Sequence, residues 1–249
     1  LLNVSASAKI IEKIVISGSK SESNRLLILQ QLFPEISIDN LSDSDDSKHL
    51  QQALSTKASF IDIGHAGTAM RFLVGYFSSK QNSEVILTGS ERMQQRPIGV
   101  LVEALRDLGA DISYVENEGY PPVRIKGKAI TKDKVQINGN VSSQYISSLI
   151  LMGTHLAKGV TIELMGEITS IPYIKMTLSL LNQLGISTYF EGNTIQVLPA
   201  KQLQKQTVVV ESDWSSASYF YSVAAFSEVG SEIQLSAYKK ESLQGDSCL

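Results

Sequence analysis

The stretch Ile14-Val15-Ile16-Ser17-Gly18-Ser19-Lys20-Ser21 contains the pattern from which the fold can be predicted. Its apolar residues predict a β-strand, Gly18 predicts a turn, and the serines around Lys20 are typical of a helix start. The pattern returns as Val135-Gln136-Ile137-Asn138-Gly139-Asn140-Val141-Ser142 and, more loosely, as Val208-Val209-Val210-Glu211-Ser212-Asp213-Trp214-Ser215-Ser216. Internal repetition of this kind predicts one supersecondary unit used at least twice, with a third copy.

A second repeat concerns two helices. One runs from Pro97-Ile98 to Leu108-Gly109 and the other from Pro172-Tyr173 to Leu184-Gly185, each with proline at its start and glycine just past its end. Each is followed by a predicted strand and hairpin, over Asp111–Ile125 and Ser187–Val197. Other predicted strands are Lys13–Ser17, Ile36–Leu41, Phe60–Ile63, Val85–Thr88, Val135–Asn138, Val160–Leu164 and Val208–Glu211; predicted helices are Glu22–Leu32, Thr68–Phe77, Ile98–Leu108, Ser143–Leu156, Tyr173–Leu184 and Ser215–Phe226. This alternation indicates an α/β architecture.

Composition limits the classes of function. The 249 residues carry a net charge of −3, so no overall positive field attracts nucleic acid or anionic lipid. The single cysteine, Cys248, excludes an internal disulfide, and His49, His65 and His155 lack metal-ligand spacing. The most apolar stretch, 146–157, is too short to span a bilayer. We therefore expect a cytoplasmic protein with no metal or cofactor, and any anion site must be local.

Three predicted helix starts are rich in hydroxyl groups. They contain Ser21, Ser23 and Asn24; Ser142, Ser143 and Gln144; and Ser215 and Ser216. The first turn of a helix has unpaired N–H groups and a partial positive charge, which favour phosphate. The alternative is that each serine only caps its own helix.

The first helix start also has two cations, Lys20 and Arg25. Lysine offers a compact charge, whereas arginine can bind a carboxylate through two hydrogen bonds. Cations at a helix start oppose the helix dipole. An anion bound there would account for their position.

Two further segments could bind anions. Gly64-His65-Ala66-Gly67-Thr68-Ala69-Met70-Arg71 is a predicted strand–turn–helix junction where Gly67 lets a ligand approach the backbone. Arg92-Met93-Gln94-Gln95-Arg96-Pro97 places two arginines before a proline-initiated helix. A solvated charged loop is the alternative interpretation of the second segment.

Together these motifs resemble the 5-enolpyruvylshikimate-3-phosphate (EPSP) synthase family. The resemblance covers essentially the whole chain and rests on seven segments in the family's order. They are Lys20-Ser21-Glu22-Ser23-Asn24-Arg25, Asp43-Ser44-Asp45-Asp46, Gly67-Thr68-Ala69-Met70-Arg71, Arg92-Met93 with Arg96-Pro97-Ile98, Ser142-Ser143-Gln144, Pro172-Tyr173, and Asp213 with Ser215-Ser216-Ala217-Ser218-Tyr219.

The resemblance implies transfer of the enolpyruvyl group of phosphoenolpyruvate to shikimate 3-phosphate, with release of phosphate, in the shikimate route to chorismate and the aromatic amino acids. It implies that Lys20 contacts both substrates and that Ser21 and Arg25 hold the hydroxyls and carboxylate of the shikimate ring. Ser142, Ser143 and Ser170 would hold the 3-phosphate, Gln144 would reach both ligands and Tyr173 would line the pocket. The Gly67 backbone and Arg96 would position phosphoenolpyruvate.

The resemblance also implies a fold of two domains, each a threefold repeat of βαβαββ units with helices packed inside. Residues 21–211 would form one complete domain, and residues 1–20 and 212–249 would belong to the other. The family's proton-transferring Asp and Glu would lie beyond Leu249, so no residue of the 249 is expected to be the catalytic acid or base. We therefore expect a chain that is inactive alone and a monomer at full length.

Two departures from the family pattern flank the Gly67 turn. His65 replaces a common Asn and Phe72 replaces a common Pro, which puts phosphoenolpyruvate affinity and glyphosate sensitivity in question. Two rival interpretations remain. One is the related UDP-N-acetylglucosamine enolpyruvyl transferase family, which commonly has a cysteine in the loop corresponding to Arg92–Arg96; the other is a non-catalytic phosphate-binding module.

Overall fold

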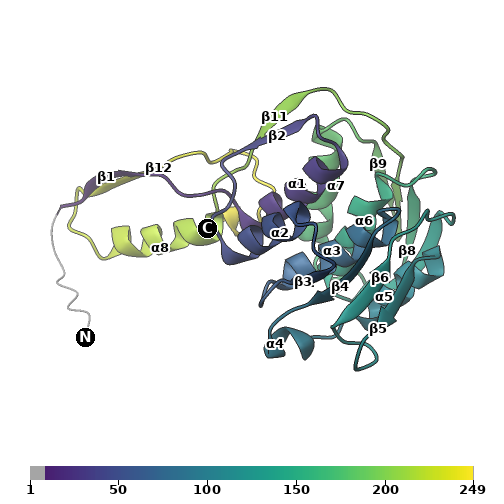
Figure 1. Ribbon diagram of the computed structural model, residues 1–249. Helices are drawn as coiled ribbons and strands as arrows, with labels where there is room; N and C mark the ends of the chain where they lie inside the picture. Colours follow the sequence, from purple (N-terminus) through teal and green to yellow (C-terminus); the bar gives the residue numbers. More distant parts are fainter. Residues whose placement is uncertain (1–8, 249) are drawn as a thin grey trace.

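The chain forms two unequal parts in the computed structural model, which describes residues 9–248. The larger part extends from α1 (Lys20–Leu32) to β11 (Gln206–Val209). The smaller part combines β1 (Ile11–Ile14), α8 (Trp214–Ala225) and β12 (Glu232–Leu235), followed by a short 3₁₀ turn. Figure 1 shows the smaller part as an arm that projects from the main body. The chain therefore crosses between body and arm twice.

Two of the sequence predictions reach outside the described range. The segments 1–20 and 212–249, expected to belong to a second domain, include residues 1–8 and Leu249, which lie outside the described residues. The structure describes these segments over residues 9–20 and 212–248. The expectation that the catalytic acid and base follow Leu249 concerns positions that are not in the sequence, so it stays a prediction.

Two four-stranded sheets of the main body have the same topology. One contains β3 (Phe60–Asp62), β4 (Glu84–Thr88), β5 (Asp111–Tyr114) and β6 (Val123–Lys126), in the order β3-β4-β6-β5. The other contains β7 (Lys134–Asn138), β8 (Val160–Met165), β9 (Thr188–Glu191) and β10 (Thr194–Val197), in the order β7-β8-β10-β9. In both, the first two strands are parallel and the hairpin is antiparallel. The predicted repeated βαβαββ unit is confirmed.

The same helices occur in each unit. The first unit holds α3 (Gly67–Ser79), the short α4 (Glu91–Gln94) and α5 (Gly99–Leu108), and the second holds α6 (Ser143–Gly153) and α7 (Ile171–Gln183). Gly109 ends α5 and Gly185 follows α7, both with positive φ, as the sequence predicted. The hairpins expected after these two helices are present as β5–β6 and β9–β10.

A third unit is smaller. Its β2 (Ile36–Asp39) pairs in parallel with β11, which returns from the far end of the chain. Its helices are α1 and α2 (Asp45–Ser55), and α2 leads directly into β3 of the next unit. Within residues 9–248, this third sheet has only these two strands, because no hairpin follows α2.

The core lies between the sheets and is made of helices. Every residue of α3 is buried, and α6 is buried except for Gln144. An apolar helix covered on all sides must sit inside a domain, so the predicted buried helices are confirmed. Within the described part of the chain, no helix has both the length and the apolar character required to cross a bilayer.

The first strand and helix α2 differ from the sequence prediction. The strand predicted over Lys13–Ser17 is Ile11–Ile14, because the backbone beyond it bonds to the returning chain: the Ile16 carbonyl accepts from the Ser212 hydroxyl and the Ser17 carbonyl from the Asp213 N–H. Helix α2 was absent from the predicted helices, although its start lies in the segment Asp43-Ser44-Asp45-Asp46 on which the resemblance partly rests. In the structure Ser44 is the cap residue, and its side chain accepts a hydrogen bond from the Ser47 N–H at 3.4 Å.

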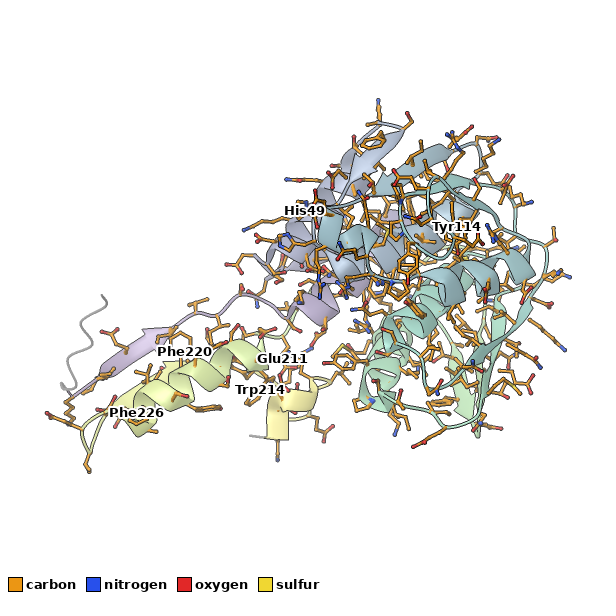
Figure 2. The ribbon with its side chains drawn as sticks, turned by 90° about the horizontal axis from the view of Figure 1, so that it is seen from below. His49, Tyr114, Glu211, Trp214, Phe220 and Phe226 are labelled. Atoms are coloured by element: carbon orange, nitrogen blue, oxygen red, sulfur yellow. The ribbon has the colours of Figure 1, made fainter. Side chains whose placement is uncertain are left out.

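Helix α8 of the arm presents many apolar side chains to solvent. Ala217 is its one buried residue, whereas Phe226, just past its end, is 85% exposed and Tyr219 75% exposed. Figure 2 shows Phe220 and Phe226 along this helix, away from the main body. The described residues thus leave an apolar face of α8 uncovered.

Close contact between α3 and α6 predicts a steric coupling. A Cβ added to Gly75 would collide with the Ser148 hydroxyl, which donates to the Arg71 carbonyl at 2.7 Å. We expect Gly75→Ala to lower the free energy of unfolding by about 1–3 kcal/mol, the usual cost of overpacking. In the Ser148→Ala background the cost of the same change should be smaller, because the obstructing hydroxyl is gone and only the Ser148 carbonyl oxygen remains close, at 3.3 Å from the added Cβ. Urea unfolding of the four proteins measures the coupling; an equal Gly75→Ala effect in both backgrounds would contradict it.

Candidate anion-binding pocket

A polar pocket of about 550 Å³ lies where the N-termini of α1, α6 and α8 meet. These are the helix starts of the three copies of the sequence pattern. The pocket is lined by Ser17, Gly18, Lys20, Ser21, Arg25, Ser42, Asp43, Ser44, Thr68, Ser142, Ser143, Gln144, Tyr173, Asp213, Ser215 and Ser216. Helix starts that are far apart in the sequence therefore surround one cavity.

Helix α1 contributes both cations of this pocket. Lys20 is exposed and forms no ion pair within the described residues. The Ser21 side chain likewise makes no hydrogen bond among the described residues, so its hydroxyl is available to a ligand. Ser19, the cap residue of α1, makes no side-chain capping bond. The amino end of α1 is therefore not closed by its own cap side chain.

Arg25 lies deeper, at the base of the pocket, with 3% of its surface exposed. Burial lowers the pKa of its guanidinium to about 10, so the group is still charged at neutral pH. Among residues 9–248 the ion pairs are Arg106–Glu118 and Arg124–Glu84, and neither involves Arg25. The charge of Arg25 is thus not neutralised by a direct carboxylate partner in this part of the chain.

Helix α6 contributes hydroxyl and amide groups. Ser142 is its cap residue, and its side chain accepts from the Gln144 N–H at 3.4 Å. The alternative interpretation, that this serine caps its own helix, therefore holds for Ser142, which also lines the cavity. Ser143 is buried and lines the cavity. The Gln144 side chain donates to the Thr68 hydroxyl at 3.1 Å, which joins the start of α6 to the start of α3.

Gly67 and Arg96 lie beside the pocket rather than in its lining. A Cβ on Gly67 would collide with the Arg96 guanidinium, so the absence of a side chain allows Arg96 to rest on the first turn of α3. Buried Arg71 supports this arrangement by donating to the Gly67 carbonyl at 3.1 Å and to the Pro97 carbonyl at 3.2 Å. The neighbouring Thr68 lines the main pocket.

The start of α7 contributes Tyr173, which lines the pocket, whereas Ser170 does not. Ser170 is the cap residue of α7 in a left-handed conformation, with φ 54°, and its side chain makes no capping bond. The predicted site residues thus fall into two sets: Lys20, Ser21, Arg25, Ser142, Ser143, Gln144 and Tyr173 share one cavity, and Gly67, Arg96 and Ser170 lie outside its lining.

Several lining residues had no assigned role in the sequence prediction. Ser17 donates to the Asp43 carboxylate at 2.7 Å, and the Asp213 carboxylate accepts from the Ser216 N–H at 2.8 Å as the cap of α8. Asp43 and Asp213 occur within motifs that were recognised. Their position at the cavity depends on chain crossings that no local pattern encodes.

Two buried glutamates, Glu22 and Glu211, lie close to the crossings between the main body and the arm. Glu211, labelled in Figure 2, accepts hydrogen bonds from the Trp214 indole at 2.8 Å, the Lys239 N–H at 2.9 Å and the Ser242 hydroxyl at 2.7 Å. Glu22 is 1% exposed, and it accepts from the Gln244 amide at 3.2 Å through one oxygen while the other has no partner. Burial is the main cause that raises the pKa of Glu22; Lys239 lowers it, and Glu211 raises it further.

The fold and the pocket together define an α/β protein of repeated βαβαββ units with hydroxyl-rich helix starts around a polar cavity, whose lining includes two cations and two carboxylates. The family model described as EPSP synthase (3-phosphoshikimate 1-carboxyvinyltransferase) matches residues 50–249. The chain belongs to the EPSP synthase family.

The relatives agree with this assignment. A 3-phosphoshikimate 1-carboxyvinyltransferase of Bacteroides fragilis is 47% identical over 246 residues, covering 98% of this chain and 59% of the relative. The protein of that name from Vibrio atlanticus is 39% identical over 268 residues, covering 96% of this chain and 62% of the relative. The chain thus spans about three fifths of the length of the curated relatives it matches.

A solved structure has the same fold. EPSP synthase from Acinetobacter baumannii superposes with a TM-score of 0.75 at 24% identity, covering 94% of this chain and 57% of that chain. At this identity the likeness concerns the fold alone.

The raised pKa of Glu22 predicts a pH-dependent stability. Above its ordinary value of 4.5 the unfolded chain releases the proton while the folded chain retains it, so folding becomes less favourable as pH rises toward the raised pKa. We expect Glu22→Gln to be more stable than the parent at pH 8, with the difference shrinking toward pH 4. Thermal unfolding at several pH values measures this difference.

Glu163→Gln is the matched control, because this carboxylate is exposed on β8. Its effect on the unfolding temperature should be small at every pH. If Glu22→Gln lowers the stability equally at pH 4 and pH 8, ionisation of Glu22 does not destabilise the folded chain and the prediction is wrong.

Proposed function

We propose that this chain binds shikimate 3-phosphate and takes part in transfer of the enolpyruvyl group from phosphoenolpyruvate to it, yielding 5-enolpyruvylshikimate 3-phosphate and phosphate. The main support is the convergence of three serine-rich helix starts and two cations on one polar cavity. Helix starts and cations both favour anions, and the acceptor carries a phosphate and a carboxylate. Membership of the EPSP synthase family supports the choice of enolpyruvyl transfer as the reaction.

We propose different contacts for the two anionic groups of the acceptor. Arg25 is a fixed, charged guanidinium at its base, which suits the carboxylate, and Ser21 beside it suits a ring hydroxyl. Ser142 and Ser143 at the start of α6 suit the 3-phosphate, and Ser170, which lies outside the lining at the start of α7, is proposed as its third contact. Tyr173 would line the ring, and Lys20 would lie between the acceptor and phosphoenolpyruvate.

Phosphoenolpyruvate is proposed to bind next to this cavity, at the start of α3. Arg96 rests on Gly67 there, which gives a cation beside backbone N–H groups. Gln144 joins the two positions through its bond to Thr68. Lys20, Gly67, Arg96 and Gln144 are therefore the proposed contacts of phosphoenolpyruvate.

We further propose that residues 21–211 form one domain and that residues 1–20 and 212–249 belong to a second domain. The support is the separate arm of β1, α8 and β12 and the uncovered apolar face of α8. The full-length protein is proposed to be a cytoplasmic monomer that uses small-molecule substrates, and the net charge of −3 gives no reason to add nucleic acid as a partner.

The roles proposed for this chain are all in substrate binding. The proton-transferring acid and base are proposed to follow Leu249 in a longer protein, and the chain spans about three fifths of its curated relatives. Enolpyruvyl transfer needs general acid–base catalysis as well as bound anions. We therefore expect the 249 residues to bind the acceptor without turning it over.

Titration calorimetry with shikimate 3-phosphate tests the proposal on the 249-residue chain. We expect saturable binding that weakens about 10- to 100-fold in Arg25→Ala and Lys20→Ala, because each change removes a hydrogen bond to a charged group. Ser142→Ala should weaken binding less. Arg124→Ala is the matched control, since Arg124 is an exposed arginine paired with Glu84 on the β4–β6 surface.

The same titration separates the rival interpretations. Equal affinity of all four variants and the parent would refute this pocket as the binding site. Tighter binding of UDP-N-acetylglucosamine than of shikimate 3-phosphate would favour the related transferase, although residues 92–96 contain no cysteine. Binding of inorganic phosphate with the same affinity as shikimate 3-phosphate would favour a general phosphate-binding module.

A further inference from the structure

Within residues 9–248 the Arg25 guanidinium forms hydrogen bonds only to neutral groups, and nearby Glu22 acts on it through its charge without forming an ion pair. Its Nε–H donates to the Thr177 hydroxyl at 2.7 Å, and one Nη1–H donates to the Ser21 carbonyl at 2.7 Å. Its Nη2 donates to the Ser147 hydroxyl at 3.1 Å and to the Tyr173 carbonyl at 3.4 Å. A guanidinium has five N–H bonds, so four are used and one on Nη1 is left for a ligand in the pocket that Arg25 lines.

The two hydroxyl groups have a single consistent orientation. Thr177 donates its proton to the Tyr173 carbonyl at 2.9 Å, so its oxygen only accepts from Arg25 and Ser147. The Ser147 hydroxyl, 3.0 Å from that of Thr177, must then donate to it and accept from Arg25. Both oxygens therefore direct lone pairs at the cation.

An aromatic ring completes this environment. The Cζ atom of Arg25 lies 5.5 Å from the centre of the Phe72 ring, and Phe72 is 1% exposed on α3. The face of a buried aromatic ring attracts a cation without carrying a negative charge. Phe72 thus favours the charged guanidinium while leaving its charge available to a ligand.

Neutral partners have a different consequence from a carboxylate partner. An Asp or Glu at this position would pair with Arg25 and compete with a ligand carboxylate for the same N–H groups. Hydroxyls, carbonyls and a ring fix the plane of the guanidinium without competing. Burial of an unpaired charge costs free energy, which binding of an anion would offset.

We propose that Phe72, Ser147 and Thr177 are positioning residues that hold Arg25 as a fixed, unneutralised cation and thereby make the pocket selective for a ligand with a carboxylate. This inference rests on the proposed function for the identity of that ligand, shikimate 3-phosphate. The three residues act through Arg25 and are not assigned a contact with the ligand.

The selectivity can be measured with two ligands, shikimate 3-phosphate and its carboxylate methyl ester. The parent chain should bind the acid more tightly than the ester, since the ester has no negative charge with which to accept a charge-assisted hydrogen bond from the remaining Nη1–H of Arg25. In Phe72→Leu and Thr177→Val the affinity for the acid should fall about tenfold, while the affinity for the ester should change less than about twofold. The ratio of the two affinities is the decisive quantity, because general damage to the fold would weaken both ligands.

Two controls separate positioning from packing. Phe77→Leu removes a ring of the same type from the same buried helix, and Phe77 packs against Tyr76 and Lys80 instead of Arg25. It should lower stability but keep the acid-to-ester ratio of the parent. Thr177→Ser keeps the hydroxyl and should also retain that ratio.

A ligand-free measurement makes the inference independent of the titration. In the parent chain with ¹⁵N-labelled arginine, the Arg25 Nε–H should exchange slowly with water because it is buried and bonded to Thr177. Thr177→Val should make this exchange faster, and Thr177→Ser should restore the parent rate.

The possible failures are distinguishable. If the parent chain binds neither ligand, the proposed function fails, and slow exchange lost in Thr177→Val would still support positioning of Arg25. If the parent discriminates acid from ester and Phe72→Leu and Thr177→Val discriminate equally well, the proposed function stands and the positioning inference is refuted.

Discussion

The two crossings between the main body and the arm are hydrogen-bonded to each other, and the pocket depends on this contact. The Ser19 N–H donates to the Glu211 carbonyl at 2.8 Å, and the Asp213 N–H donates to the Ser17 carbonyl at 3.1 Å. Helix α1 begins one residue after Ser19 and α8 one residue after Asp213. Joining the crossings therefore places two helix starts side by side. The third start, that of α6, is connected through Ser147 to Arg25 of α1.

The charged groups of the cavity lining differ in the hydrogen bonds and ion pairs that they form within the protein. The Asp43 and Asp213 carboxylates accept hydrogen bonds from Ser17 and Ser216, so part of their charge is balanced locally. Lys20 has no ion-pair partner in the described chain, and the partners of Arg25 are neutral. Lys20, the first residue of α1, also opposes the helix dipole, an arrangement that costs stability in an empty helix start. The lining thus holds two cations and two carboxylates without ion pairs among them, and Lys20 together with the remaining N–H of Arg25 is the electrostatic basis proposed for binding an anion.

Local features of the fold could be predicted from the sequence. Proline and glycine at the ends of α5 and α7 act through backbone geometry within a few residues, and the two hairpins follow from strand periodicity. Pairing of β2 with β11 could not be predicted, because Ile36 and Gln206 are far apart and short apolar runs do not specify partners. The same holds for the site. The serine-rich helix starts are visible as motifs, whereas the contact of Arg25 with Thr177 joins positions 152 residues apart.

The three units differ in whether they have a hairpin, and the hairpins do not contribute to the cavity lining. The third unit lacks a hairpin after α2, yet its helix α1 provides both cations of the cavity. None of the residues that line the cavity comes from β5, β6, β9 or β10, the hairpins of the other two units. Hairpins extend the sheets that cover the core, and helix starts form the pocket, so these two parts of each unit serve separate purposes. A unit can therefore lack the hairpin and still contribute groups to the cavity lining, as the third unit does.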